Sequence, residues 1–253
     1  MTSTIPTSSK GLNEEKKAPS SNGQAAGEKK ISERIRARLV AEGVSFLAND
    51  NVSEHIQPGE LDELEIEVAE RVRDLLETLL IDVDNDHNTE ETAERVARMY
   101  LNEVFKGRYQ KQPKVTSFPN VKQLDEIYTV GPITVRSACS HHFVPIMGSC
   151  WIGIKPGNRV IGLSKFARVA DWVFSRPHIQ EEAVMILADE IERLCEPQGL
   201  GIIVRAEHYC MKLRGVMEPQ CTMVNSVVRG VFRHDSSLKQ EFFELVRQQE
   251  ASL

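Results

Sequence analysis

The order of strand-like and helix-like segments in the second half of this 253-residue chain limits its fold more than any other feature. In chain order, the strand-like segments are 126–137, 143–155, 201–212 and 222–232, and the helix-like segments are 164–175, 179–195 and 237–248. Because short turns join neighbouring strands, we expect antiparallel pairing. The pattern therefore predicts an α+β fold with the helices on one face of the sheet.

The first half of the chain predicts helices instead. From residue 31 to about 107, apolar residues recur at spacings near three and four. One helix is expected to begin at Asn88, a favourable N-cap with Glu91 at the capping-box position. Residues 1–30 hold few large apolar side chains, which predicts a disordered tail. The expected parts are a tail over 1–30, a helical region over 31–115 and an α+β domain over 116–253.

Composition argues against several classes of protein. The formal net charge is −6, whereas nucleic-acid binding without sequence preference depends on Lys and Arg that neutralise phosphates. No apolar run reaches the roughly 18 residues of a membrane helix, and residues 1–30 lack the apolar stretch of a secretory signal. Five cysteines at irregular spacing argue against a disulfide framework and for a reducing compartment. We expect a cytoplasmic protein with no nucleic-acid or membrane partner.

Two short motifs carry potential metal ligands. Cys139 and His142 are three residues apart at the end of a strand-like segment, and Zn²⁺ accepts a thiolate and an imidazole together. His208 and Cys210 lie two apart in a later strand-like segment, so we expect them on one face. Three ligands, Cys139, His142 and Cys210, would leave an open fourth position, which is typical of catalytic zinc. His141 and His208 would then be available as proton carriers.

Two other interpretations fit the same residues. His208 could complete a four-coordinate structural zinc site, or the cysteines could be small buried apolar residues without a metal. The spacing alone does not separate these three alternatives.

A second group of residues predicts an anion site. Lys165 and Arg168 share one face of an expected helix, and Ser164 stands where an N-cap belongs. Lys212 and Arg214 form another basic pair close to the possible metal ligands. Two basic pairs support a phosphate-bearing ligand about as well as they support a solvated helix face.

The start of the next helix carries Gln180 and Glu181. A carboxylate in a pocket can accept two hydrogen bonds from an edge such as guanine N1–H and N2–H. Favourable charge at a helix N-terminus is the simpler explanation for these residues taken alone.

Four segments in matching order resemble the GTP cyclohydrolase I family. They are CSHHFV at 139–144, IGLSKFARV at 161–169, RPHIQE at 176–181 and HYCMKLRG at 208–215. A weaker match is TAERVARMY at 92–100, and the segment 222–232 is similar to a Thr/Ser-rich strand of the family. The resemblance runs from about Glu60 to Val246.

The resemblance implies a zinc-dependent enzyme that converts GTP to 7,8-dihydroneopterin triphosphate and formate, the first step of pterin and tetrahydrofolate biosynthesis. It also implies the tunnelling fold, a ββααββ unit that follows N-terminal helices. Family members assemble as decamers of two pentameric rings, with active sites at subunit interfaces. A homodecamer is therefore the expected state of this chain.

The family's functional residues have counterparts in this sequence. By resemblance, Cys139, His142 and Cys210 would hold zinc, which supplies hydroxide at neutral pH for attack at C8 of the purine. The other implied roles are proton transfer by His141 with help from His208, guanine binding by Glu181 and Gln180, and triphosphate binding by Ser164, Lys165, Arg168, Arg214 and Arg95. Arg95 would act either in the site of its own chain or in that of a neighbouring subunit.

Three departures from the family pattern keep other functions open. Ser140 replaces the usual Glu, Glu182 replaces an Arg, and Ala93-Glu94 replace the Pro-His that precedes Arg95. The missing carboxylate at 140 affects the expected rate and metal affinity rather than the ligand identity. The alternatives are a sister activity on a related purine or pterin and a catalytically weak paralogue that binds nucleotide or acts as a regulatory subunit.

Overall fold

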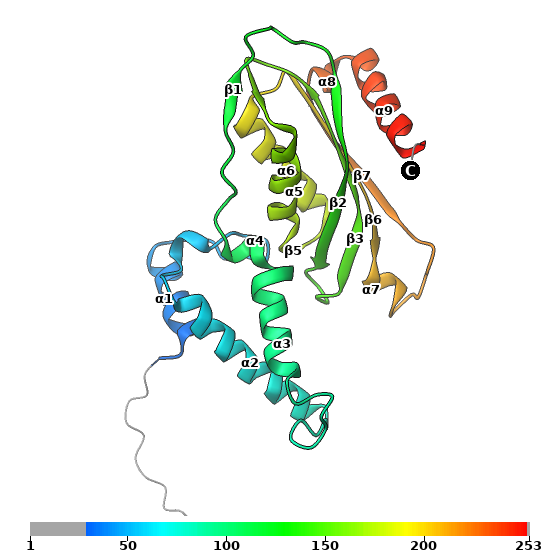
Figure 1. The fold of residues 1–253 in the computed structure, drawn as a ribbon. Helices are drawn as coiled ribbons and strands as arrows, with labels where there is room; N and C mark the ends of the chain where they lie inside the picture. The colour runs from blue at the N-terminus through cyan, green and yellow to red at the C-terminus, as the bar shows by residue number, and fades with distance from the viewer. Residues whose placement is uncertain (1–28, 252–253) are drawn as a thin grey trace, which may run out of the picture.

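The structure is a computed structural model that describes residues 29–251, and Figure 1 shows how its elements are arranged. The tail expected over 1–30 lies outside the described residues except for its last two positions. Residues 31–109, which we call the helical arm, form helices as predicted. Its elements are α1 (Ile31–Ala41), the 3-10 turn η1 (Ser53–His55), α2 (Glu60–Thr78), α3 (Thr92–Arg98), the π-helix η2 (Met99–Val104) and α4 (Lys106–Tyr109).

Residues 117–251, which we call the sheet unit, are built on a five-stranded sheet in the order β5-β2-β3-β6-β7. The four long strands pair antiparallel, as predicted, and β5 adds a short parallel pairing at the end of β2. The strands are β2 (Tyr128–Cys139), β3 (Pro145–Lys155), β5 (Pro177–His178), β6 (Gly199–His208) and β7 (Met223–Gly230), and a second small sheet pairs β1 (Ser117–Pro119) with β4 (Arg159–Ile161).

Helices α5 (Leu163–Phe174) and α6 (Gln180–Cys195) cover one face of the sheet (Figure 1). Each helix buries a stripe of apolar residues against alternate residues of the central strands. The resulting core includes Cys150, Ile152 and Ile154 of β3 together with Phe166, Val169 and Val173 of α5. The ββααββ order and these two helices confirm the fold class that the sequence predicted.

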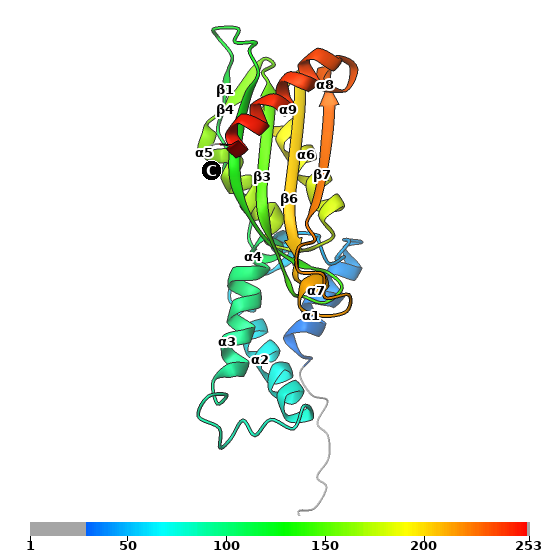
Figure 2. The same ribbon diagram turned by 90° about the vertical axis from the view of Figure 1, so that its right-hand side faces the viewer.

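The opposite face of the sheet is covered by α9 (Ser236–Ala251), which follows the short helix α8 (Val231–His234) (Figure 2). Gly153 and Gly201 make room for Phe242 of this helix, because a Cβ at either glycine would come within 2.5 Å of the phenyl ring. The prediction of helices on one face thus describes α5 and α6, and α9 adds a layer on the other face.

The prediction that a helix of the arm begins at Asn88 is wrong. Asp86 Oδ1 accepts hydrogen bonds from the backbone and side-chain N–H groups of Asn88, both at 2.9 Å, so Asn88 lies in a turn. Glu91 binds Arg95 at 2.6 Å instead of closing a capping box. The helix α3 therefore begins at Thr92 with Glu91 as its N-cap, three residues later than the predicted N-cap.

Arg176 joins the helical arm to the sheet unit. Its guanidinium donates to Gly107 O and Asn49 O, both at 3.1 Å, and lies 4.0 Å from the centre of the Trp172 ring. Burial lowers the pKa of Arg176 to about 10, which still leaves the side chain charged at neutral pH. Of the helices between residues 29 and 251, none combines the length and apolarity needed to cross a bilayer.

Candidate metal centre and active site

Cys139, His142 and Cys210 come together at the lower end of the sheet in Figure 1, where β2 ends. One potential ligand atom from each residue lies within 4.8 Å of those of the other two. Cys139 is buried, Cys210 is half-buried and His142 is exposed, so the group opens toward the surface on the histidine side. The structure therefore brings together the three residues that the sequence singled out as metal ligands.

A tight turn after β2 brings His142 back toward Cys139. The backbone N–H groups of His142 and Phe143 both donate to Cys139 O, and Cys139 N–H donates to Val144 O at 2.9 Å. Phe143 adopts a left-handed conformation with φ of 55°, which closes the turn. As a result, Cys139 Sγ lies 3.9 Å from His142 Nδ1.

Cys210 reaches the group by a different route from the one predicted. The sequence placed it two residues beyond His208 in the same strand, but β6 ends at His208 and Cys210 lies in the short helix α7 (Tyr209–Lys212). The pairing of β6 with β3 ends at the pair Ile146–His208, beside Pro145, which has no N–H to donate. The chain turns there, and the first turn of α7 carries the thiol to Cys139.

The chemistry of this group fits a single metal ion. Two thiols and an imidazole within 4.8 Å suit a metal with bonds of about 2.0–2.3 Å, as zinc has to nitrogen and sulfur. Burial, followed by the neighbouring Cys139 thiol, raises the pKa of Cys210 above its usual value. A nearby cation favours the thiolate form of such a cysteine, and a bound metal provides one.

The two remaining histidines lie next to the three potential ligands. His141 is exposed, and its Nδ1 lies 3.8 Å from Cys139 Sγ. His208 is half-buried at the end of β6, where its Nε2 lies 2.8 Å from Gln180 Oε1. Burial lowers the pKa of His208, and the charge of Glu181 opposes that shift. This pair of histidines offers proton acceptors and donors at the metal centre.

Three of the predicted substrate-binding residues also lie at this end of the sheet. Gln180 is buried and Glu181 is exposed in the first turn of α6. The guanidinium of Arg214 contacts Nε2 of His142. These side chains add a carboxylate and a cation around the histidines.

The basic residues of α5 lie elsewhere. Gly162 is the N-cap of this helix, so Ser164 is not the N-cap that the sequence predicted. Ser164, Lys165 and Arg168 occupy the first turns of α5, whereas its last turn leads to β5 beside Cys139. At about 1.5 Å per residue, Ser164 and Lys165 lie roughly 14–15 Å, and Arg168 roughly 9 Å, along the helix from its last residue, so these side chains are set apart from the end that leads to the metal group.

Arg95 is also remote from the metal centre within one chain. It lies on α3 in the helical arm, where it is exposed and paired with Glu91. Within the described residues, the structure thus divides the predicted site into a metal part at the end of the sheet and a basic part on α5 and α3.

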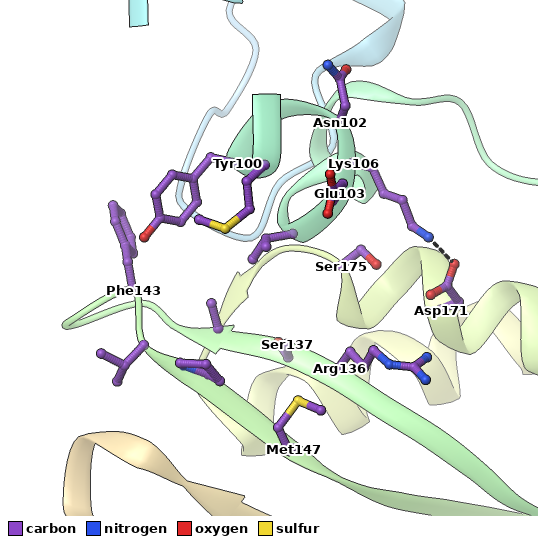
Figure 3. Close-up of a pocket in the computed structure, with 15 residues that line it drawn as sticks. Tyr100, Asn102, Glu103, Lys106, Arg136, Ser137, Phe143, Met147, Asp171 and Ser175 are labelled. Atoms are coloured by element: carbon purple, nitrogen blue, oxygen red, sulfur yellow. Dashed lines mark ion pairs between the residues drawn. The ribbon is translucent and has the colours of Figure 1, made fainter. Parts of the chain in front are cut away.

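A cavity of about 640 Å³ is lined by Phe143 and Val144 of the turn that follows β2 (Figure 3). Its walls come from η2, from the ends of β2 and β3, and from α5, with Tyr100 and Phe143 on one side. The ion pair between Lys106 and Asp171, at 2.7 Å, lies on the other side. No sequence motif indicated this cavity, because its lining residues come from segments that only the fold brings together.

The fold and the site define a tunnelling-fold protein with a candidate metal centre of two cysteines and a histidine. The model of the family "GTP cyclohydrolase I" matches residues 68–247. GTP cyclohydrolase 1 of Actinobacillus pleuropneumoniae serotype 5b (strain L20) is 32% identical over 216 residues, which cover 85% of this chain and 96% of that protein. The chain belongs to the GTP cyclohydrolase I family.

Two more relatives named GTP cyclohydrolase 1 are similar in sequence. GTP cyclohydrolase 1 of Erwinia tasmaniensis is 34% identical over 181 residues, covering 71% of this chain and 81% of that protein. The protein of the same name from Aliivibrio salmonicida is 31% identical over 214 residues, covering 84% and 95%. Among solved structures, the apo form of archaeosine synthase QueF-Like covers 47% of this chain and 97% of its own, with 12% identity and a TM-score of 0.33.

Proposed function

We propose that this protein is an active GTP cyclohydrolase I that converts GTP to 7,8-dihydroneopterin triphosphate and formate. The observation that carries the proposal is the convergence of Cys139, His142 and Cys210 within 4.8 Å in a chain of this family. The product would enter pterin and tetrahydrofolate biosynthesis. The reducing cytoplasm is the fitting compartment, because the two cysteines must stay reduced to bind a metal.

Zinc is the metal that these three donors favour. Soft thiolates and an imidazole are its usual ligands, and three protein ligands leave one position open. When bound in such a site, zinc supplies Lewis-acid activation of water near neutral pH. Cys139, His142 and Cys210 would hold it at the end of the sheet.

The neighbouring side chains would handle the protons and the base. His141, beside Cys139, would donate and accept protons at the imidazole-ring nitrogens of the purine, and His208 would assist. The exposed carboxylate of Glu181 can accept hydrogen bonds from guanine N1–H and N2–H, which would orient the ring. Arg214, in contact with His142, would bring a positive charge to the triphosphate side.

We also propose that a neighbouring chain completes the site. Ser164 and Lys165 lie roughly 14–15 Å, and Arg168 roughly 9 Å, along α5 from the end that leads to the metal group, so they fit the triphosphate of a site formed with the next subunit. Arg95, on the arm, would act in the same way. The proposed assembly is a homodecamer of two pentameric rings, in which the outer edge of β7 and the part of the β2 edge that β5 does not cover are available for pairing between copies.

A catalytically weak paralogue is the second candidate function. Ser140 favours it, because the family's usual carboxylate at this position is missing next to Cys139. The Ser140 N–H donates to His178 O at 3.0 Å, which preserves the backbone of the turn. The turnover rate separates the two candidates.

The deciding experiment measures GTP turnover by the purified full chain as pterin fluorescence after oxidation, with bound zinc quantified in the same sample. Turnover with close to one zinc per chain is the expected result. Zinc without turnover would favour the weak paralogue, and Ser140→Glu would then be tested for recovery. A chain with neither zinc nor turnover would overturn the proposed function.

Replacement of Cys210 tests the metal assignment directly. We expect Cys210→Ser to lose zinc and to lower turnover by at least about 100-fold, because three ligands cannot spare one. Cys221→Ser is the matched control, since this half-buried cysteine lies outside the ligand group. Zinc content equal to that of the control would show that Cys210 is not a ligand.

A further inference from the structure

The side chains of Asn225, Gln180 and His208, from three different elements, form a hydrogen-bonded chain. Gln180 of α6 lies in the middle, with only 3% of its surface exposed. Its Nε2 lies 2.6 Å from Asn225 Oδ1 on β7 and 3.1 Å from Val204 O on β6. Its Oε1 lies 2.8 Å from His208 Nε2. Both ends of the Gln180 amide are thus occupied by protein atoms.

The partners determine which atom of the amide faces which neighbour. Val204 O is a backbone carbonyl and can only accept, so the NH₂ group of Gln180 must face it. The amide oxygen of Gln180 then faces His208, and because this oxygen can only accept, His208 Nε2 must carry a proton. The neutral ring is left with its lone pair on Nδ1, and this nitrogen is the one that can accept a proton.

Asn225 supplies the second acceptor for the Gln180 NH₂ group, at the shorter of the two distances. Without it, the buried NH₂ group loses its shortest hydrogen bond, and only Val204 O at 3.1 Å and a long contact to Met223 O at 3.5 Å hold the side chain. A rotated amide would turn its NH₂ group toward His208 Nε2. That contact requires a lone pair on Nε2 and a proton on Nδ1, which is the opposite tautomer.

We propose that Asn225 is a positioning residue that acts through Gln180 to hold His208 in the Nε2–H tautomer. The inference deepens the proposed function, on which it rests for the catalytic role of His208. Neither Asn225 nor Gln180 needs to touch the substrate in this role. The Asn225–Gln180 contact joins positions 45 residues apart, and it forms because β7 and β6 pair in the register that sets Asn225 opposite Val204.

Kinetics of the zinc-loaded full chain provide the first test. We expect Asn225→Ala to lower kcat about 10- to 100-fold, the usual range for a partner that orients a catalytic group, and to leave KM within about threefold. Asn225→Asp keeps an acceptor oxygen and is expected to retain kcat within about threefold of the wild type. Ser226→Ala, at the next residue of β7 and exposed, is the matched control with unchanged kinetics.

The tautomer itself is the readout that a merely structural role would not change. Imidazole ¹⁵N spectra of ¹⁵N-histidine-labelled, zinc-loaded protein distinguish a protonated nitrogen from one with a lone pair, and a His208→Gln sample identifies the signals. We expect a proton on Nε2 in the wild type and in Asn225→Asp, and a population with a proton on Nδ1 in Asn225→Ala. Zinc content and oligomer mass, measured on the same samples, are expected to be equal.

Two results would overturn the inference. One is a wild-type spectrum with the proton on Nδ1 of His208. The other is an Asn225→Ala spectrum identical to that of the wild type, whether or not kcat falls. The spectra are recorded without GTP, so they test the positioning role independently of turnover. A wild-type protein without turnover would overturn the proposed function, whereas the position of the proton on His208 would still decide whether Asn225 sets the tautomer.

Discussion

The sheet unit and the helical arm bury their apolar side chains to very different extents. In the sheet unit, α5 buries five residues in a helix of 12, and α9 closes the opposite face around Phe242. In the arm, the 19-residue helix α2 has a single buried residue, the charged Glu60. The first unit is therefore stabilised by one large core, whereas the arm combines a small apolar cluster around Ile35 and Leu39 with polar contacts and leaves several leucines exposed.

The polar contacts of the arm centre on Arg38 and Glu60. Two parallel hydrogen bonds of 2.7 and 2.6 Å join the guanidinium to the carboxylate, and Gln57 N–H donates to the same carboxylate at 2.8 Å. A small apolar cluster around Ile35 and Leu39 lies beside them. Because this pair shifts the pKa of Glu60, it makes the stability of the arm depend on pH.

The largest expected effect on stability comes from the sheet unit. Phe242→Ala removes a fully buried ring that fills the space above Gly153 and Gly201, where no other side chain can replace it. We expect a loss of about 3–5 kcal/mol in the free energy of unfolding, measured by denaturant titration at fixed protein concentration.

The neighbouring Phe243→Ala is the matched control, because Phe243 is only partly buried. It is expected to cost less than half as much. Equal losses in the two variants would contradict the view that the second face of the sheet carries a tightly packed core.

A smaller effect, dependent on pH, is expected in the arm. The hydrogen bonds from Arg38 lower the pKa of Glu60 from 4.5 to about 2. Because the folded-state pKa is the lower one, the stabilisation is fully present above pH 4.5 and is lost as the pH falls toward 2. Glu60→Gln should therefore cost roughly 2–3 kcal/mol at pH 7, and the difference from the wild type should shrink below pH 4.5.

Glu63→Gln serves as the control on the same helix. Its partner Arg34 lies at 2.5 Å, but the Glu63 side chain is 55% exposed, so the pair is screened by water and its loss should cost less than about 1 kcal/mol. If the free energies of unfolding of Glu60→Gln and the wild type differed by the same amount from pH 7 to pH 2, the stability of the arm would not be linked to protonation of Glu60.

The sequence predicted the layers of the fold better than the geometry of the site. Strand and helix periodicities gave the ββααββ order, and motifs identified Cys139, His142 and Cys210. The route to Cys210 was wrong, because the end of β6 depends on its pairing with β3 beside Pro145, which residue composition does not reveal. The face covered by α9 was missed for a related reason: amphipathicity predicts that a helix has a buried side, not which surface it meets.

Asn225 shows the limit of sequence reasoning most clearly. A single Asn within a strand-like segment gives no signal of function, and its contact with Gln180 exists only in the observed register of β7 and β6. Ser164 was assigned as an N-cap from its residue type, yet the chain enters α5 at Gly162. In both cases the decisive information is the position of a backbone that is set by distant contacts.

The smallest expected effect on the stability of a single chain concerns the C-terminal end of α2, where Leu75 is 56% exposed and the C-cap Leu79 is 61% exposed. If a second copy of the chain covers them, Leu75→Ser should change the free energy of unfolding of the separated chain by less than about 1 kcal/mol and yet weaken the assembly. Analytical ultracentrifugation over a dilution series would show the variant dissociating at higher concentration than the wild type. Leu124→Ser, which alters a leucine 59% exposed outside the arm, is the matched control, and equal dissociation of the two variants would contradict a role for the arm in assembly.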